Sequence, residues 1–506
     1  MAQSKQTPAT VYLVGAGPGD PGLVTLRGVE CLRRAEVVLY DYLVNPAVLE
    51  HAPTGAELVC LGRHGDGRIM PPEEVSQRMI RSASDGRTVV RLKGGDPAVF
   101  ARGAEEATAL AEAGIPFEIV PGITAALAVG SYAGIPLTHR ELASAVTLIT
   151  GQEDADKTDS GVDFSALAAM RGTLVFYMGV TTVRHWTDAL IAAGKPADVP
   201  AAIVRRCSLA DQTTIYCTLG SLAEQIEAAR VRPPALAIIG PVVSLGPALD
   251  WFSRRPLFGT RVLVTRPRDQ AAALAGPLAE MGADVLRQPV IEIGPPDDLA
   301  AVDAAISRLG EFDWIVFSSA NGVERLLGRL LAGAGDLRAL GGVKIAAIGP
   351  ATVERLAGYH LKCDLHPAEY RAEALAAALT PQAAGKRFLL ARASRGREVL
   401  AEQLTTAGGH VEQVVVYSST DVTAAEPDVA EAMSQGRIDW VTVTSSAIAR
   451  SLVALFGEQL RACRLASISP ITSQTLQELG HNAAVEAEEY TSAGVVEAIA
   501  QAAKSC

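Results

Sequence analysis

Three glycine-rich segments, each directly after an apolar run, carry the residues best suited to chemistry. The first is Val11–Gly28, VYLVGAGPGDPGLVTLRG, in which a β-branched run opens into a loop of glycine and proline. The other two are Lys93–Pro97 (KGGDP), after the run Thr88–Leu92, and Pro121–Ala126 (PGITAA), after the run Phe117–Val120. The apolar runs predict buried strands, and glycine lets a loop backbone approach a ligand closely. Because α/β proteins bind nucleotide-like ligands at the carboxyl ends of parallel strands, we expect the three loops to share one sheet edge.

The first loop alone leaves the ligand open, because it also fits a dinucleotide-binding pattern. Gly17 to Gly22 satisfies G-x-G-x-x-G, and Asp41 ends a second predicted strand, where an acid would bind a ribose hydroxyl. Against this interpretation, Pro18 and Pro21 each remove a backbone N–H group that a pyrophosphate would need. A dinucleotide, another nucleotide-like cofactor and a glycine turn without a ligand remain open at this point.

The composition describes a well-packed protein and excludes several classes of function. The chain has 506 residues, of which 49% are hydrophobic and 20% charged. A net charge of −11 argues against nonspecific nucleic-acid binding, and two Gly-Pro pairs interrupt the longest apolar stretch, Ala235–Leu249, so we expect no membrane span. The N-terminus lacks the apolar core of a signal peptide, and the seven cysteines form no C-x-x-C pair. We therefore expect a cytoplasmic protein with reduced thiols and no bound metal.

The second half of the chain contains an internal repeat. Residues 244–259 hold two prolines and a basic pair, which predicts a linker. The pairs that match beyond it are Gly259 and Gly385, Arg266 and Arg392, and Ser319 and Ser445 at a shift of 126 residues, and Thr352 and Thr472 at a shift of 120 residues. Such a repeat predicts two similar α/β lobes with a cleft between them.

The strand-to-helix segments of the two lobes would bring polar groups to this cleft. Residues 316–319 (VFSS) and 443–446 (VTSS) offer hydroxyl groups and the N–H groups of helix N-termini, which suit carboxylate ligands. Simple capping of the helices is the alternative role for each Ser and Thr. For this half as a whole, a bilobal sugar- or ion-binding module that acts as an intracellular sensor is the non-enzymatic alternative.

As an ordered set, the three glycine loops resemble those of the tetrapyrrole (class III) S-adenosylmethionine-dependent methyltransferases, and within them the uroporphyrinogen-III C-methyltransferases. The similarity runs from about Val11 to Leu245 and includes YD at 40–41, PLTHR at 136–140, TG at 150–151 and FYMG at 176–179. It implies two α/β subdomains, about 10–137 and 138–245, a homodimer, and S-adenosyl-L-methionine as methyl donor. Attack of a pyrrole carbon on a sulfonium methyl mainly needs alignment of the reactants, and a base for the departing proton.

The resemblance assigns roles to individual residues of the first half. Asp41 matches the proposed catalytic base of the family, with a helix cap or ribose contact as its alternative role. The residues that would surround the cofactor are Pro18, Gly94, Gly95, Asp96, Val99, Thr124, Ala125, Met178 and Cys207. Some members carry a lysine, proposed as proton donor, where this chain has Arg63, which keeps its proton but can clamp a carboxylate. We expect Arg63, Arg102 and Arg140 to bind substrate carboxylates, with a solvated surface charge as the alternative for each.

The second half resembles the uroporphyrinogen-III synthases. The matching segments are VFSSANGV (316–323), AIGPAT (347–352), LLARASRGREVLAEQL (389–404), VVVYSST (414–420) and VTVTSSA (441–447). Family members cross twice between lobes, which implies one lobe of about 259–293 plus 421–506 and another of 294–420. Tyr417 matches the tyrosine that would hydrogen-bond the leaving hydroxyl of hydroxymethylbilane, with cleft filling as its alternative role. The expected carboxylate ligands are Ser319, Thr352, Ser445 and Thr472, and Ser469 stands where the family usually has glycine.

The sequence thus predicts α/β folds throughout, with a methyltransferase half (1–245), a linker (246–258) and a synthase half (259–506). The second half would cyclise hydroxymethylbilane to uroporphyrinogen III with inversion of ring D. The first would methylate that product twice to precorrin-2, on the way to sirohaem or cobalamin. Two alternatives stay open: an NAD-dependent precorrin-2 dehydrogenase, and a methyltransferase fused to a non-catalytic tetrapyrrole-binding module.

Overall fold

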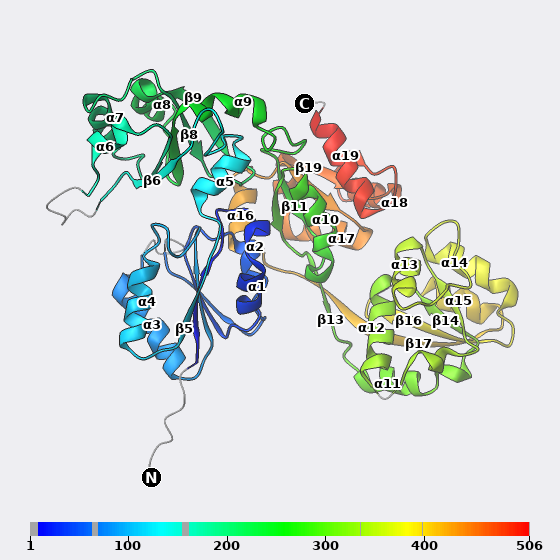
Figure 1. Ribbon diagram of the computed structural model, residues 1–506. Helices are drawn as coiled ribbons and strands as arrows, with labels where there is room; N and C mark the ends of the chain where they lie inside the picture. Colours follow the sequence, from blue (N-terminus) through cyan, green and yellow to red (C-terminus); the bar gives the residue numbers. More distant parts are fainter. Residues whose placement is uncertain (1–8, 63–68, 154–160, 334, 397, 505–506) are drawn as a thin grey trace, which may run out of the picture. The chain divides into compact units, whose positions relative to one another are not determined.

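The computed structural model of the chain describes residues 9–62, 69–153, 161–333, 335–396 and 398–504. They form four five-stranded sheets with helices packed against them (Figure 1). The chain divides into two compact units, one of residues 1–260 with 279–284 and one of residues 261–278 with 285–506. The prediction of α/β folds throughout is confirmed. Within the described ranges, no helix is both long enough and apolar enough to cross a bilayer.

The first sheet is parallel throughout, with strand order β3-β2-β4-β1-β5. Its strands are β1 (Val11–Gly15), β2 (Val37–Tyr40), β3 (Glu57–Cys60), β4 (Val89–Lys93) and β5 (Phe117–Val120). Successive side chains point to opposite faces, so Leu13 joins the core with α3 and α4, and Val14 joins the core with α1 and α2. These helices are α1 (Leu26–Leu32), α2 (Pro46–Leu49), α3 (Pro72–Ser84) and α4 (Gly103–Glu112). The loops that follow β1, β2, β4 and β5 therefore meet at one edge.

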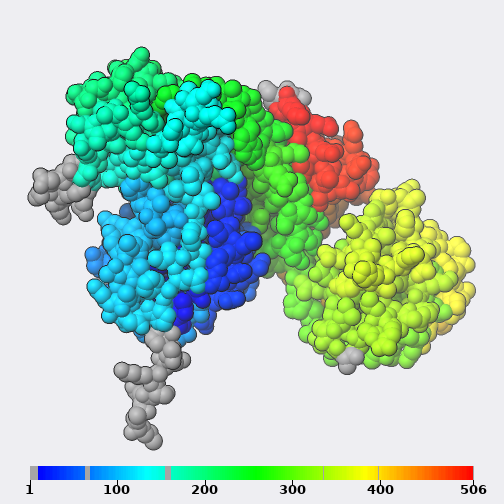
Figure 2. Space-filling model, in the orientation of Figure 1, coloured from blue at the N-terminus to red at the C-terminus, as the bar shows by residue number. Residues whose placement is uncertain are grey.

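The second sheet is mixed, with order β6-β7-β10-β8-β9. Its strands are β6 (Val146–Thr150), β7 (Thr173–Tyr177), β8 (Pro200–Arg205), β9 (Thr213–Thr218) and β10 (Ala235–Ile239), and its helices are α6 (Phe164–Ala169), α7 (Val183–Ala192) and α8 (Leu222–Ala228). On one face, Trp186 of α7 stacks on Phe176 of β7, with ring centroids 4.1 Å apart. The other face packs against α5 (Ala125–Tyr132), which directly follows the last loop of the first sheet. In the space-filling view the blue-to-cyan and teal-to-green subdomains of this unit adjoin (Figure 2).

The predicted linker, residues 246–258, is ordered and packed. It begins with α9 (Gly246–Leu249), and Phe252 is only 3% exposed. The ring of Phe252 lies edge-on to Tyr132 of α5 at 4.8 Å, and the Trp251 indole N–H donates to the Ser131 carbonyl at 2.8 Å. The prolines and the basic pair of this segment thus accompany a buried aromatic cluster.

The second unit contains two further sheets. One has order β12-β11-β18-β19-β20, with β11 (Arg261–Val264), β12 (Asp284–Arg287), β18 (Trp440–Val443), β19 (Arg464–Ser467) and β20 (Ala483–Glu486). The other has order β13-β17-β16-β14-β15, with β13 (Ile291–Gly294), β14 (Trp314–Phe317), β15 (Lys344–Ala347), β16 (Arg387–Ala393) and β17 (His410–Asp421). The chain passes between the sheets twice, after β12 and after β17. Strand β13 pairs antiparallel with β17 and so belongs to the second of these sheets.

Helices cover both faces of the second of these sheets. Ile315 and Phe317 of β14 pack with α11 (Leu299–Ser307), α12 (Ala320–Ala332) and α13 (Pro350–Gly358), whereas Trp314 and Val316 pack with α14 (Ala372–Leu379) and α15 (Val399–Thr406). The helices of the other sheet are α10 (Arg268–Glu280), α16 (Pro427–Ser434), α17 (Ser446–Phe456), α18 (Pro470–Glu478) and α19 (Ser492–Lys504). Each sheet carries a strand-to-helix turn of the repeat, β14 to α12 and β18 to α17.

Candidate active sites

The three glycine loops of the first unit meet as a continuous backbone surface. The Gly17 N–H donates to the Gly95 carbonyl at 3.2 Å, and the Gly95 N–H donates back to the Gly17 carbonyl at 2.8 Å. A Cβ atom at Gly122 would lie 2.2 Å from the Gly95 oxygen and 2.7 Å from the Gly15 Cα. Because these contacts are with backbone atoms, they cannot yield to a side chain. The glycines therefore let three strand ends approach one another, as the sequence predicts.

Asp96 fixes the geometry of this surface. One of its carboxylate oxygens accepts from the Gly122 N–H at 2.9 Å, and the other accepts from the Ala98 N–H at 2.7 Å. The first bond holds the second loop against the third, and the second bond fixes the turn of the second loop itself. Asp96 thus orders the second and third glycine loops through hydrogen bonds to their backbone.

A tyrosine that sequence reasoning did not single out joins the third loop to the second sheet. The Tyr177 hydroxyl lies 2.7 Å from the Thr124 hydroxyl and accepts from the Ala126 N–H at 2.8 Å. Burial raises the pKa of Tyr177, so the phenol stays neutral. The next residue, Met178, has a φ of +52° and is 49% exposed. A left-handed methionine with an exposed thioether is an unusual local conformation, of the kind that concentrates at ligand sites.

Cys207 contributes an apolar part of the same surface. It lies in one core cluster with Tyr177, against which Val99 and Ala125 also pack. Burial raises the pKa of Cys207 to about 12, so the thiol is neutral. The neighbouring Ser208 accepts from the Asp20 N–H at 3.0 Å, which ties this loop to the Pro18 loop. Of the residues that the resemblance assigns to the cofactor, contacts link Gly95, Asp96, Val99, Thr124, Ala125 and Cys207 through the glycine loops and the core cluster. Pro18, Gly94 and Met178 directly adjoin residues of this surface in the chain.

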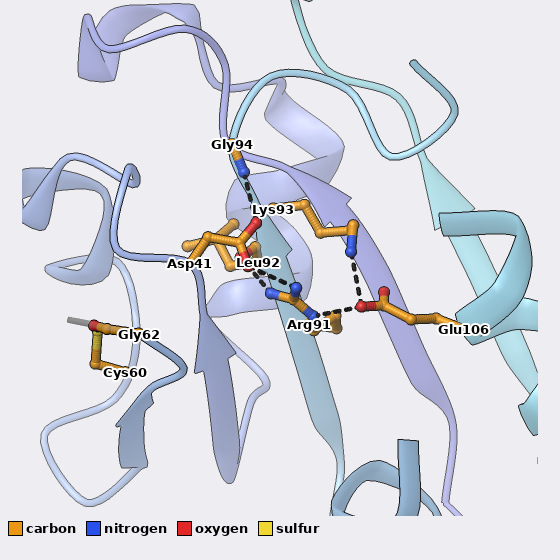
Figure 3. A network of polar contacts seen from close by, with 8 residues as sticks. All are labelled: Asp41, Cys60, Gly62, Arg91, Leu92, Lys93, Gly94 and Glu106. Carbon is orange, nitrogen blue, oxygen red and sulfur yellow. Dashed lines mark hydrogen bonds and ion pairs between the residues drawn. The ribbon is translucent and has the colours of Figure 1, made fainter. Parts of the chain in front are cut away.

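Asp41 lies directly after β2, beside the second glycine loop (Figure 3). One carboxylate oxygen accepts from the Gly94 N–H at 3.2 Å, and the other accepts from Arg91 Nη2 at 2.5 Å. The side chain is 31% exposed. Its carboxylate is therefore oriented from within the protein while part of it remains reachable from outside.

A buried network of charges lies behind Asp41, and sequence reasoning missed it. Arg91 and Lys93 are 5% and 1% exposed, and Glu106, at the start of α4, is 7% exposed. One Glu106 oxygen accepts both from Arg91 Nε at 3.0 Å and from Lys93 Nζ at 2.7 Å (Figure 3). Together with Asp41, these groups balance two positive charges against two negative charges. The available signal was Arg91 and Lys93 within an otherwise apolar strand, since buried charges require partners.

Replacing Glu106 with glutamine should destabilise the first unit strongly. The variant leaves Arg91 and Lys93 as neighbouring buried cations, and breaking a buried pair in this way costs about 3–5 kcal/mol. For a unit of this size that loss lowers its thermal transition by roughly 6–20 °C at neutral pH. Differential scanning calorimetry of the full chain measures the shift.

The pH dependence of this loss has a defined sign. Burial lowers the pKa of Lys93 in the folded state, and Glu106 opposes that shift. Without Glu106 the folded state releases the Lys93 proton at lower pH, so the variant gains stability relative to the native chain as the pH rises toward about 10. Glu105 is an exposed neighbour in the same helix turn, so Glu105→Gln is the matched control. It should change neither the thermal transition temperature nor its pH dependence. Equal transitions for the Glu105 and Glu106 variants would contradict the role given to the network.

The three arginines expected to bind substrate differ in what the structure shows. Arg102 is exposed at the N-terminus of α4 with a φ of +55°, and Arg140 is exposed after the second subdomain begins. Within the described ranges neither forms an ion pair. Arg63 lies outside the described residues.

In the second unit, the structure brings Tyr417 and Ser319 together. Their hydroxyl oxygens are 3.0 Å apart, and Tyr417 is 7% exposed. Ser319 also caps α12, because its hydroxyl accepts from the Gly322 N–H at 3.0 Å. The capping serine thus holds the tyrosine at the carboxyl edge of its sheet.

The equivalent residues of the repeat have matching conformations. Ser445 caps α17 by accepting from the Ile448 N–H at 3.1 Å, as Ser319 caps α12. Thr352 and Thr472 are both buried in the first turns of α13 and α18. Ser469 has a φ of −164°, extended backbone that any residue adopts, so serine is accommodated where the family usually has glycine.

Comparisons with known proteins cover both units. Residues 10–223 match the family described as Tetrapyrrole (Corrin/Porphyrin) Methylases, and residues 272–497 match Uroporphyrinogen-III synthase HemD. The chain is 32% identical over 481 residues to Porphyrin biosynthesis protein HemD of Ruminiclostridium josui, covering 95% of this chain and 93% of that one. It is 46% identical over 235 residues to S-adenosyl-L-methionine-dependent uroporphyrinogen III methyltransferase of Methanosarcina barkeri, and the match covers 46% of this chain and 92% of that one. A crystal structure of uroporphyrin-III C-methyl transferase from Thermus thermophilus complexed with S-adenyl homocysteine has 40% sequence identity and a TM-score of 0.41. The match covers 47% of this chain and 99% of that one.

Proposed function

Because the chain belongs to the tetrapyrrole methylase and uroporphyrinogen-III synthase families, we propose that it is a bifunctional enzyme of tetrapyrrole biosynthesis. Its second unit cyclises hydroxymethylbilane to uroporphyrinogen III. Its first unit methylates that product twice, with S-adenosyl-L-methionine, to precorrin-2. The observation that carries the proposal is that each unit holds one acid–base side chain in a fixed orientation. In the first unit Arg91 orients the carboxylate of Asp41, and in the second Ser319 orients the phenol of Tyr417.

The glycine surface of the first unit fits a nucleoside cofactor better than a pyrophosphate. Gly15 and Gly122 leave no room for side chains, and Gly95 has a φ of +73° that favours glycine, so a flat ligand can lie against bare backbone. Pro18 supplies no N–H group at the loop where a dinucleotide phosphate would bind. S-adenosyl-L-methionine supplies an electrophilic methyl group when bound. The neutral Cys207 and the exposed thioether of Met178 are compatible with a sulfonium, which needs a weakly polar wall.

Asp41 removes the proton that leaves the methylated macrocycle. Arg91 and the Gly94 N–H hold its carboxylate from two directions, so that the base is pre-oriented before the substrate arrives. Arg91 in turn is held by Glu106, which makes Arg91 and Glu106 positioning residues. Arg63, Arg102 and Arg140 supply carboxylate contacts for a substrate with eight carboxylates.

Tyr417 assists loss of the hydroxyl group from hydroxymethylbilane in the second unit. Its phenol supplies a proton to the leaving oxygen, which departs as water. The resulting cation rearranges, and the proton that the macrocycle loses on ring closure returns to the phenolate. Ser319 orients the phenol, and Ser319, Thr352, Ser445 and Thr472 provide hydroxyl groups for substrate carboxylates. The helix N-termini next to these residues add N–H donors for the same charges.

Gly122→Ala should abolish most cofactor binding. The new methyl would meet the Gly95 oxygen and the Gly15 Cα, and separating the loops to relieve the clash displaces Gly95 and Thr124. Overpacking of this kind costs about 1–3 kcal/mol, and we expect S-adenosylmethionine affinity to fall by more than about tenfold. Isothermal titration calorimetry measures it. Gly55→Ala is the control, because a Cβ at Gly55 meets no atom within 4 Å; a normal affinity for Gly122→Ala would remove the glycine surface from the cofactor site.

We further propose that the protein is a cytoplasmic homodimer formed through the first unit. The edge strand β5 exposes Phe117 and Ile119, at 37% and 44%, which is a surface that a second copy could cover. Six cysteines of the described residues are free thiols, which suits a reducing compartment. Sedimentation velocity of the full chain tests the dimer.

Two measurements on the purified full-length chain separate the proposal from its alternatives. Binding of S-adenosylmethionine and not of NAD supports a methyltransferase, whereas binding of NAD alone would indicate a precorrin-2 dehydrogenase. Without a methyl donor, the chain should convert hydroxymethylbilane to the type III isomer. If only the spontaneously closed type I isomer forms, the second unit is a binding module and not a synthase.

A further inference from the structure

Arg266 is a partly buried cation of the second unit with no acidic partner among the described residues. It follows β11 and precedes α10, at the carboxyl edge of its sheet. Its guanidinium donates to the Ser492 hydroxyl at 2.8 Å and to the Gln270 side-chain oxygen at 3.4 Å. In the part of the chain that the structure describes, no carboxylate forms an ion pair with it. Burial lowers its pKa, while Asp269 opposes that shift from a distance, and an arginine with such neutral partners remains charged.

The internal repeat supplies a reference for this position. Arg392 is the residue that matches Arg266 in the other sheet, at the end of β16. Arg392 forms an ion pair with Glu398 and also donates to the Gln413 side-chain oxygen at 2.6 Å. The same repeat position therefore carries a neutralised arginine in one lobe and an arginine without a counter-ion in the other. Since an uncompensated partly buried charge is costly, the difference needs a cause.

Arg266 is connected to the residues already assigned to the synthase site. Gln270, which it contacts, donates to the Asn321 side-chain oxygen at 2.5 Å. Asn321 lies in the first turn of α12, whose capping residue Ser319 contacts the Tyr417 hydroxyl. Arg266 and Tyr417 are thus linked by hydrogen bonds through Gln270, Asn321 and Ser319, with the first turn of α12 joining Asn321 to Ser319. Arg266, Ser492, Gln270 and Asn321 are all partly exposed, so a ligand can reach them.

We propose that Arg266, together with the Ser492 hydroxyl, binds a carboxylate of the linear tetrapyrrole that the second unit cyclises. The inference rests on the proposed synthase function and adds to it a cationic anchor that the hydroxyl ligands lack. A guanidinium holds a carboxylate through two parallel N–H donors, and a substrate carboxylate supplies the missing counter-ion. The substrate is then held at Arg266 on one side and at Tyr417 on the other, with the polar contacts between them lining its path.

The test compares Arg266→Gln, Arg266→Lys and the repeat-matched control Arg392→Gln in the full-length chain. Initial rates of uroporphyrinogen III formation are measured against hydroxymethylbilane concentration, with methylation of added uroporphyrinogen III as an internal standard. Arg266→Gln should raise KM by about tenfold or more while kcat stays within about threefold, because a ground-state contact is lost. Arg266→Lys keeps the charge and loses the paired donors, so its KM should rise by less, about threefold. Arg392→Gln should leave KM unchanged.

An unchanged KM in Arg266→Gln, or an equal rise in Arg392→Gln, would overturn the inference. If Arg266→Gln does not fold, as judged by its circular dichroism, the KM of Arg266→Lys decides in the same way. The rise in KM should also shrink with added salt, as expected for a lost ionic contact and not for a distorted fold. Failure of the native chain to make the type III isomer would instead refute the proposed function, so the two failures are distinguishable.

Discussion

Replacing Asp41 with asparagine should lower kcat for methylation of uroporphyrinogen III by about 10²–10⁴-fold, the range that a positioned general base contributes. Asparagine has the size of aspartate and can still accept from the Gly94 N–H. It cannot accept the proton that leaves the macrocycle. The affinity for S-adenosylmethionine should change little, because the glycine surface is built from other loops.

The measurement is a methyl-transfer assay with radiolabelled donor and saturating uroporphyrinogen III. Asp198→Asn is the matched control, since Asp198 is an exposed aspartate of the same unit with no hydrogen bond or ion pair among the described residues. The Asp41→Asn variant should also keep full synthase activity. Methylation by Asp41→Asn at a rate near that of the control would show that Asp41 is a cap or a ribose contact and not the base.

Replacing Tyr417 with phenylalanine should impair the synthase activity and leave methylation of added uroporphyrinogen III unchanged. The phenol is the hydrogen-bond donor for the leaving hydroxyl, and loss of one such donor in a buried site costs about 10²–10³-fold in kcat. The ring is 7% exposed, and phenylalanine keeps its packing. The product should shift from the type III isomer toward the spontaneously formed type I isomer, which chromatography of the oxidised porphyrins resolves.

Tyr359→Phe controls for the loss of a hydroxyl elsewhere in the same lobe. Tyr359 packs beside the same core cluster as Tyr417 but lies at the far end of α13. It should retain normal synthase activity, and both tyrosine variants should methylate added uroporphyrinogen III normally. A Tyr417 variant with native rate and isomer ratio would leave the tyrosine with only its packing role.

The parts of the fold that depend on short-range sequence could be predicted. Strand Phe117–Val120 is correct to the residue, and the three glycine loops meet as expected, because each follows its own strand. The repeat likewise located Ser319 and Ser445, since helix caps are set within a few residues. The predicted family membership is confirmed for both halves.

Other features depend on contacts between residues far apart in the chain. Glu106 meets Arg91 and Lys93 only because α4 returns across β4, and Tyr177 meets Thr124 only because α5 packs on the second sheet. No local pattern encodes these pairings. Residues 246–258 were predicted as a linker from their prolines, yet Phe252 is buried, because burial depends on what α5 presents to it. The difference between Arg266 and Arg392 also depends on the folded structure, because Glu398 forms an ion pair with Arg392 and not with Arg266.

The most direct test of the account is a single incubation of the full-length chain with hydroxymethylbilane and S-adenosylmethionine, followed by mass spectrometry and isomer analysis. We predict one tetrapyrrole product of type III arrangement that carries two added methyl groups. Asp41→Asn should stop this product at unmethylated uroporphyrinogen III, and Tyr417→Phe should largely prevent the type III ring. An unmethylated product, or a product only of the type I arrangement, from the native chain would contradict the claim that both activities reside in it.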